Sequence, residues 1–136
     1  MRSVAIFCIS IFCSLQVFAY SNPLIRICRI NSGLFTEISV EQPASDKLPF
    51  CQFGQALVGS LSILEFQTEG RTSEALRAYK NSADCEISGG STLQGSADLL
   101  PVTFCQFSDG SVIEAETLRG GPQSPHNQML NQVLGL

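Results

Sequence analysis

A segment anchored by two cysteines occurs twice in this chain, and it constrains the fold more than any other feature. The first copy begins with CRINSG at Cys28 and ends with CQFG at Cys51. The second begins with CEISGG at Cys85 and ends with CQFSDG at Cys105. The paired cysteines are 23 and 20 positions apart. Self-similarity of this kind indicates one structural unit that is built twice.

The first 19 residues have the features of a secretory signal peptide. Arg2 gives a positive start, residues 4–18 are mostly apolar, and Val17 and Ala19 are small residues at the positions that a signal peptidase inspects. We predict cleavage after Ala19 and export to the periplasm or the cell exterior. A membrane anchor is the alternative, but the apolar run is shorter than the roughly 20 residues that a span needs. No stable membrane insertion is expected after cleavage.

Four cysteines remain after cleavage, because Cys8 and Cys13 leave with the signal. In an exported chain, an even number of cysteines predicts disulfides. Four cysteines allow three pairings, and the composition does not choose between them. A duplicated unit should carry its own bridge, which favours Cys28–Cys51 and Cys85–Cys105.

A zinc site is the competing interpretation of these cysteines. The chain has no CxxC pair, and its one histidine, His126, lies in an expected linker. We therefore expect neither a metal nor another cofactor. The cleaved chain has seven basic and twelve acidic residues, a net charge of −5. This charge argues against nucleic acid as a partner and against capture by anionic membranes.

The spacing of apolar residues predicts the same order of elements in both copies. In the first copy, Asn22-Pro23 begins a helix that Gly33 ends with a left-handed residue, residues 35–40 form a strand, and residues 42–48 form a loop. An extended stretch then covers residues 50–53, and the absence of a clear turn after it predicts an irregular or partly helical hairpin.

In the second copy, residues 72–88 are predicted to be helical, followed by a short strand over residues 91–94 and a loop through Asp98. Residues 102–107 form the next strand, Asp109-Gly110 a hairpin turn and residues 112–118 the return strand. Beyond them the sequence predicts a linker over residues 119–128 and a terminal helix over residues 127–136 that docks on the modules through Met129, Leu130, Val133 and Leu134. A tail that contacts a partner or a membrane is the alternative, although about ten residues would not stay helical in isolation.

These elements predict an α+β protein made of two small tandem modules. Each module is a helix followed by a three-stranded antiparallel β-meander, and one disulfide joins the end of the helix to the middle strand. The expected segments are the signal peptide (1–19), the first module (20–69), the second module (70–119), and the linker with the C-terminal helix (120–136).

The second copy resembles the bacterial family catalogued as domain of unknown function 333, whose members often carry a haemolysin label. The resemblance rests on CEISGG at Cys85, on Cys105 and on DGSVIE at Asp109, while the first copy supplies Asn22-Pro23, Cys28 and Gly33. The chain departs from the family in having no tryptophan after the acidic residue of the last strand. The resemblance implies a small exported bacterial module without an established biochemical role.

The sequence lacks the residue patterns of common enzyme classes. There is no GxSxG, no HExxH and no glycine-rich phosphate loop. Glu114 and Glu116 are predicted on one face of the last strand, where paired carboxylates usually solubilise. A catalytic role for His126 with Glu114 is therefore a minor alternative, and no catalytic residue is predicted.

A disulfide-stabilised binding module, with a protein or another envelope component as its partner, is the favoured hypothesis. The candidate contacts lie in the loops between the paired cysteines. These loops are residues 42–48, with Asp46 and Lys47, in the first copy and residues 95–100, with Asp98, Leu99 and Leu100, in the second. These loops could equally serve as connections alone. A secreted lytic factor is the alternative that the resemblance suggests, and an inhibitor of an exported hydrolase is a further one.

Overall fold

The computed structural model describes residues 22–42 and 46–136, and it confirms a mixed helix-and-strand protein with two disulfides. The predicted signal peptide, its cleavage site and the middle of the predicted 42–48 loop lie outside the described residues. The first half contains α1 (Pro23–Ile30), β1 (Leu34–Val40), β2 (Lys47–Phe53), β3 (Ala56–Gly59) and α2 (Ser60–Glu69). The second half contains α3 (Glu74–Lys80), β4 (Ser91–Ala97), β5 (Leu100–Gln106), β6 (Val112–Glu114) and α4 (Ala115–Gly120), followed by η1 (Gly121–Gln123), η2 (Pro125–Asn127) and α5 (Gln128–Leu134).

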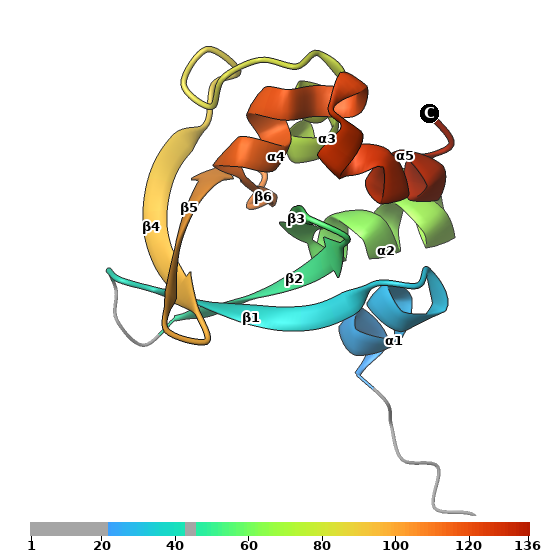
Figure 1. The fold of residues 1–136 in the computed structure, drawn as a ribbon, viewed down its shortest axis with the longest axis horizontal. Coiled ribbons are helices and arrows are strands. Elements are labelled where there is room, and N and C mark those ends of the chain that lie inside the picture. Colours follow the sequence, from blue (N-terminus) through green and yellow to red (C-terminus); the bar gives the residue numbers. More distant parts are fainter. Residues whose placement is uncertain (1–21, 43–45) are drawn as a thin grey trace, which may run out of the picture.

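The sequence predicts two separate modules, but the two three-stranded meanders close together into one barrel. Its strand order is β1-β2-β3-β6-β5-β4, with every neighbouring pair antiparallel. An isolated meander would leave two edge strands with unpaired backbone groups. Pairing β1 with β4 and β3 with β6 covers all four edges at once, so the two copies complete each other (Figure 1).

The barrel has approximate twofold symmetry that follows from the repeat. Ser39 pairs with Ser96, and each lies eleven residues after the first cysteine of its copy. On the opposite side Val58 pairs with Ile113. Within each copy, these two residues pair with the second cysteine, Val58 with Cys51 and Ile113 with Cys105. Equivalent residues thus meet at both seams between the copies, as a twofold axis through the barrel requires.

Apolar side chains fill the barrel interior and a second layer beneath the helices. Inside the barrel, the equivalent residues Phe50 and Phe104 are fully buried and pack edge to face with ring centroids 5.9 Å apart. Gly95 occupies in the second copy the position that Ile38 occupies in the first. A side chain at Gly95 would collide with Ile38, because its Cβ would lie 2.7 Å from the Ile38 Cγ2 atom. The large cluster outside the barrel joins α1, α3 and α5 to the strands. Figure 1 shows the helices gathered on one side, so the turn between β4 and β5 stays uncovered.

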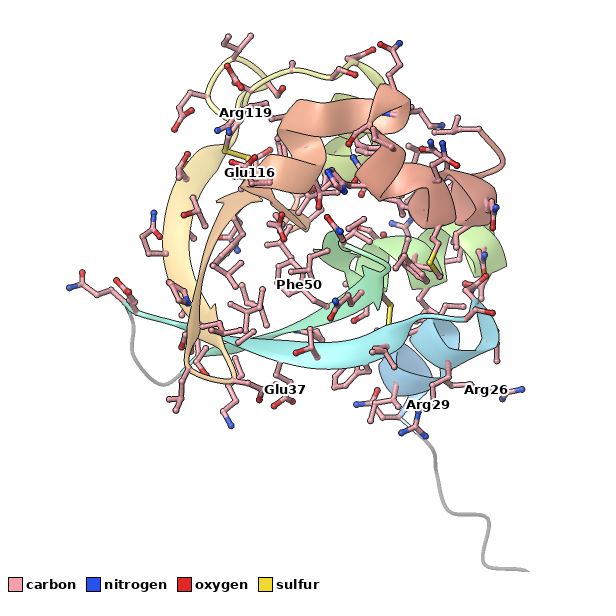
Figure 2. The ribbon with its side chains drawn as sticks, viewed as in Figure 1. Arg26, Arg29, Glu37, Phe50, Glu116 and Arg119 are labelled. Atoms are coloured by element: carbon pink, nitrogen blue, oxygen red, sulfur yellow. A yellow bond between two sulfur atoms is a disulfide. The ribbon has the colours of Figure 1, made fainter. Side chains whose placement is uncertain are left out.

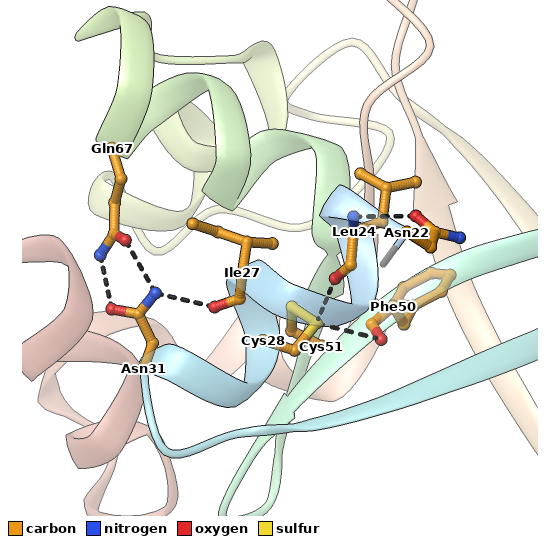
Figure 3. The surroundings of a disulfide bond; sticks show 8 residues. All are labelled: Asn22, Leu24, Ile27, Cys28, Asn31, Phe50, Cys51 and Gln67. Carbon is orange, nitrogen blue, oxygen red and sulfur yellow. Dashed lines mark hydrogen bonds between the residues drawn. A yellow bond between two sulfur atoms is a disulfide. The ribbon is translucent and has the colours of Figure 1, made fainter. Parts of the chain in front are cut away.

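Both predicted disulfide pairings are confirmed. Cys28 on α1 joins Cys51 on the middle strand β2, and Cys85 joins Cys105 on the middle strand β5. Asn22 caps α1 as expected, because its Oδ1 accepts a hydrogen bond from the Leu24 amide at 2.9 Å (Figure 3). Each bridge therefore fastens the segment before the first strand of its copy to the centre of the sheet.

The glycines after the first cysteine of each copy have a role that the sequence did not reveal. Ser32, not Gly33, is the left-handed residue that ends α1, with φ 63°. Gly33 is required because a Cβ there would lie 2.5 Å from the Phe53 ring. In the second copy Gly89 takes the left-handed position, with φ 85°, and a Cβ on Gly90 would lie 2.3 Å from the Cys105 sulfur. The pair combines a positive-φ residue with a close approach to the core.

Several predicted boundaries in the second half are wrong. The helix expected over residues 72–88 ends at Lys80, so Cys85 lies in a turn. The return strand ends at Glu114, because the following residues Ala115, Glu116, Leu118 and Arg119 favour a helix, and Leu118 is buried by it. In the first half, the irregular hairpin expected after β2 is a two-residue turn in which Gly54 supplies φ 64°.

The predicted linker is an ordered part of the fold. Residues 121–127 form two 3₁₀ turns, and buried Asn127 donates to the carbonyls of Thr117 and Gly121 at 3.0 and 2.9 Å. The predicted docking of the terminal helix is confirmed, since Leu130 and Leu134 of α5 are buried in the large cluster. Among residues 22–42 and 46–136, no helix is long and apolar enough to cross a membrane.

Candidate functional site

Three of the five predicted binding residues line one hollow on the outside of the barrel. Lys47, Asp98 and Leu99 surround a shallow depression of about 610 Å³. The remaining wall comes from β1 and from the end of β4, through Phe35, Thr36, Glu37, Ser39 and Ser96. The seam between β1 and β4 therefore places predicted residues of both copies around the same surface.

The other two predicted residues lie beside this hollow. Asp46 is exposed, and its carbonyl accepts a hydrogen bond from the Val40 amide at 2.9 Å, which fixes the start of β2 against the end of β1. Leu100, the first residue of β5, is 69% exposed. Neither side chain lines the depression.

The second predicted loop, residues 95–100, is not a loop but two strands joined by a tight turn. Ala97 pairs with Leu100, so only Asp98 and Leu99 connect β4 to β5. Both have positive φ, 47° and 68°, as a type I′ hairpin turn requires. The ladder of β4 and β5 therefore holds Asp98 and Leu99 at a fixed place beside the hollow.

The electrostatics of the hollow are mildly acidic. Lys47 Nζ lies 3.9 Å from a Glu37 carboxylate oxygen, and both side chains are more than half exposed. Such an exposed pair contributes little to stability, so both groups can exchange this contact for one with a partner. Figure 2 shows Glu37 on the outer face of the barrel, whereas Phe50 points into it. The charged groups are thus directed toward solvent.

A second cavity of about 490 Å³ lies beside α4 and contains the residues of the minor catalytic hypothesis. Glu114 and His126 both line it, together with Glu116 and Arg119. Glu114 and Glu116 do not share a strand face, because Glu116 lies in α4. Burial raises the pKa of the Glu114 carboxyl, while hydrogen bonds from Thr117 oppose this shift and the charge of Glu116 adds to it.

Arg119 and Thr117, which also line this cavity, are engaged in the fold. Arg119 contacts Glu116 at 2.5 Å and Asp84 at 3.4 Å. The Thr117 hydroxyl is buried and accepts a hydrogen bond from the Leu57 amide at 3.0 Å, which ties α4 to β3. Thr117 is therefore a structural group, and the cavity presents a half-buried carboxyl beside an exposed histidine.

Within the part of the chain that the structure describes, no group of three or more histidine, cysteine or acidic side chains could hold a metal ion. The four bridged cysteines are buried, with Cys85 the most exposed at 6%. Buried bridges of this kind belong to an oxidising, extracellular environment and serve the fold.

The outer residues of β1 are the part of the hollow that the sequence missed. Alternation along residues 35–40 places Glu37 and Ser39 on the outer face. Only the pairing of β1 with β4 shows that this face lies next to Asp98 and Leu99. The repeat itself was a possible signal for this pairing, because the equivalent edge strands of two copies can pair and complete one sheet.

No family model, no curated protein and no solved structure matches the chain.

Proposed function

We propose that this chain is an exported, non-enzymatic protein that binds another protein or an envelope component in the periplasm or outside the cell. The contact surface is the hollow beside the β4–β5 turn. In this proposal residues 1–19 are a cleaved signal peptide, and the chain is a duplicated member of the haemolysin-labelled family of domain of unknown function 333.

The observation that carries the proposal is the meeting of Lys47, Asp98 and Leu99 at one surface. Lys47 belongs to the first copy and Asp98 and Leu99 to the second, and the closure of the barrel brings them together. The helices cover other parts of the barrel (Figure 1). At this end the side chains of Leu99, Lys47 and Glu37 are exposed to solvent. A rigid, disulfide-fastened surface loses little conformational freedom when it binds, which favours recognition.

The experiment starts from the mature, oxidised protein, whose intact mass before and after reduction reports the cleavage site and both bridges. The immobilised protein is used to capture a partner from an envelope extract, and the purified partner is titrated by calorimetry. Replacing Glu37 with Gln and Asp98 with Asn, both in the hollow, should weaken binding at least tenfold. Replacing Arg26 and Arg29 with Ala should change it less than about twofold, because both project from α1 away from the barrel (Figure 2).

Two outcomes would contradict the proposal. In the first, the double variant of the hollow binds as tightly as the wild type. In the second, the protein captures no partner and instead releases dye from liposomes, which would favour the lytic alternative. Turnover of a substrate that is lost on replacement of Glu114 and His126 would favour catalysis.

A further inference from the structure

Leu99 occupies a backbone conformation that suits leucine poorly. It is the second residue of the β4–β5 turn, where φ is 68°. Type I′ turns favour Asn-Gly or Asp-Gly, because positive φ brings the Cβ of other residues close to the backbone. Asp98 fits the first position of such a turn, whereas Leu99 stands where glycine is preferred.

The described residues 22–42 and 46–136 offer little packing that would compensate for this conformation. The Leu99 side chain is 95% exposed, and the adjacent Leu100 is 69% exposed. The hairpin is instead held by seven register pairs, which run from Ser91 with Gln106 to Ala97 with Leu100. A strained residue that the fold does not use indicates a role in function.

The surroundings of Leu99 identify the chemistry of its partner. Asp98 precedes it, Glu37 lines the same hollow, and Asp46 is exposed next to Lys47. Among the described residues that line the hollow, Lys47 is the one basic residue, and its Nζ lies 3.9 Å from a Glu37 carboxylate oxygen. An exposed leucine surrounded by acidic side chains is complementary to an apolar pocket that has basic side chains around it. The same acidic charge would be repelled by an anionic membrane surface.

We propose that Leu99 is the anchor of the interaction: its side chain enters an apolar pocket of a protein partner that carries basic groups around that pocket. The inference rests on the proposed function and specifies the anchor and the partner class. The β4–β5 ladder holds the leucine in place before binding, so little conformational freedom is lost when the complex forms. Leu100 extends the apolar contact on the other side of the turn.

A first measurement tests whether Leu99 serves the fold. In Leu99→Gly the turn gains its preferred residue, so the urea midpoint of unfolding should stay the same or rise. A fall of the midpoint would show that the leucine stabilises the hairpin, and it would overturn the premise.

A second measurement tests the anchor with the purified protein that the wild type captures. Leu99→Gly should weaken binding at least tenfold. The matched control is Ile87→Ser, because Ile87 is also an exposed apolar residue (80%) but lies in the turn before β4. The control should change binding less than about twofold.

The Asp98→Asn variant tests the charge complementarity. It should slow association with the captured protein at low salt and have a smaller effect at high salt.

The outcomes separate this inference from the proposed function. If the wild type and Leu99→Gly bind the captured protein equally, the binding function stands and the anchor is refuted. If neither the wild type nor any variant binds a protein, both the proposed binding function and the Leu99 anchor are refuted. Leu99-dependent binding to phosphatidylglycerol vesicles, with no protein bound, would also overturn the inference, because it would assign the leucine to a membrane.

Discussion

At the residue scale, small side chains at positions of close approach decide whether the two copies can fold. Gly90 faces both sulfurs of the second bridge, since an added Cβ would lie 2.3 Å from Cys105 Sγ and 3.1 Å from Cys85 Sγ. These sulfurs are fixed by a covalent bond and cannot move aside as a flexible side chain would. The equivalent Gly33 faces the Phe53 ring.

Gly90→Ala should therefore lower the free energy of unfolding by about 2–3 kcal/mol, because the new methyl group overpacks the bridge. Gly135→Ala is the matched control. Gly135 has φ 69° but nothing within 4 Å of an added Cβ, so only the backbone strain of about 1 kcal/mol applies. Urea unfolding of oxidised protein compares the two. An equal loss of stability in both variants would refute the role of close approach.

The buried phenol of Tyr79 makes stability dependent on alkaline pH. Burial raises the pKa of Tyr79 to about 12, and the neutral phenol donates a 2.6 Å hydrogen bond to Asn131. The folded pKa lies above the ordinary value of 10.0, so the stabilisation is complete below pH 10 and is lost as the pH rises toward 12.

Unfolding measured between about pH 9 and 11.5 should show a fall of about 1–2 kcal/mol from this group. In Tyr79→Phe, which cannot ionise, the fall should be smaller by this amount, although stability at neutral pH is lower through loss of the hydrogen bond. Parallel pH profiles for the two proteins would contradict the assignment.

At the element scale, the segment after α4 holds the C-terminal helix against the barrel. Its composition resembles a linker, with two glycines and two prolines between residues 120 and 125. In the structure Asn127 connects this segment to the end of α4 and to η1 through two buried hydrogen bonds. Asn131 continues the connection to η1, because its amide donates to the Pro122 carbonyl at 2.7 Å.

Asn127→Ala leaves the Thr117 and Gly121 carbonyls without this donor and should destabilise the protein by about 2–3 kcal/mol. His126→Ala is the neighbouring control, and because His126 is exposed we expect a change within about 0.5 kcal/mol. Thermal or urea unfolding distinguishes them. If the two variants lose similar stability, the buried amide is not what secures α5.

At the scale of the whole molecule, the barrel is an assembly of two half-chains. Each disulfide lies within one half, and among the described residues no disulfide joins the halves. The halves are held together by the seams β1–β4 and β3–β6 and by the shared apolar clusters. This arrangement resembles a symmetric dimer whose subunits have been joined by the segment after α2.

A protease site inserted between Gly70 and Arg71, which are exposed between α2 and α3, tests this arrangement. The cleaved protein should elute as one species of unchanged size in native buffer. In urea it should separate into two fragments without any reductant. The uncleaved insertion variant is the control. Separation of the fragments in native buffer would show that the halves depend on the covalent connection.

Much of the local structure could be predicted, because it depends on residues that are near in sequence. The Asn22-Pro23 helix start, the strand at residues 35–40 and the Asp109-Gly110 turn have local causes. The disulfide pairing followed from the repeat. Boundaries failed where tertiary contacts decide them, as at Glu114, where burial of Leu118 favours a helix over a longer strand.

For the candidate site, the sequence identified Lys47, Asp98 and Leu99 one by one but could not place them together. Their proximity depends on β1 pairing with β4 across copies, and such a pairing leaves no trace in local periodicity. The repeat by itself determined what each half contains and which cysteines it joins. The tertiary structure alone decided that the two halves share one barrel, because edge strands gain their missing hydrogen bonds only from each other.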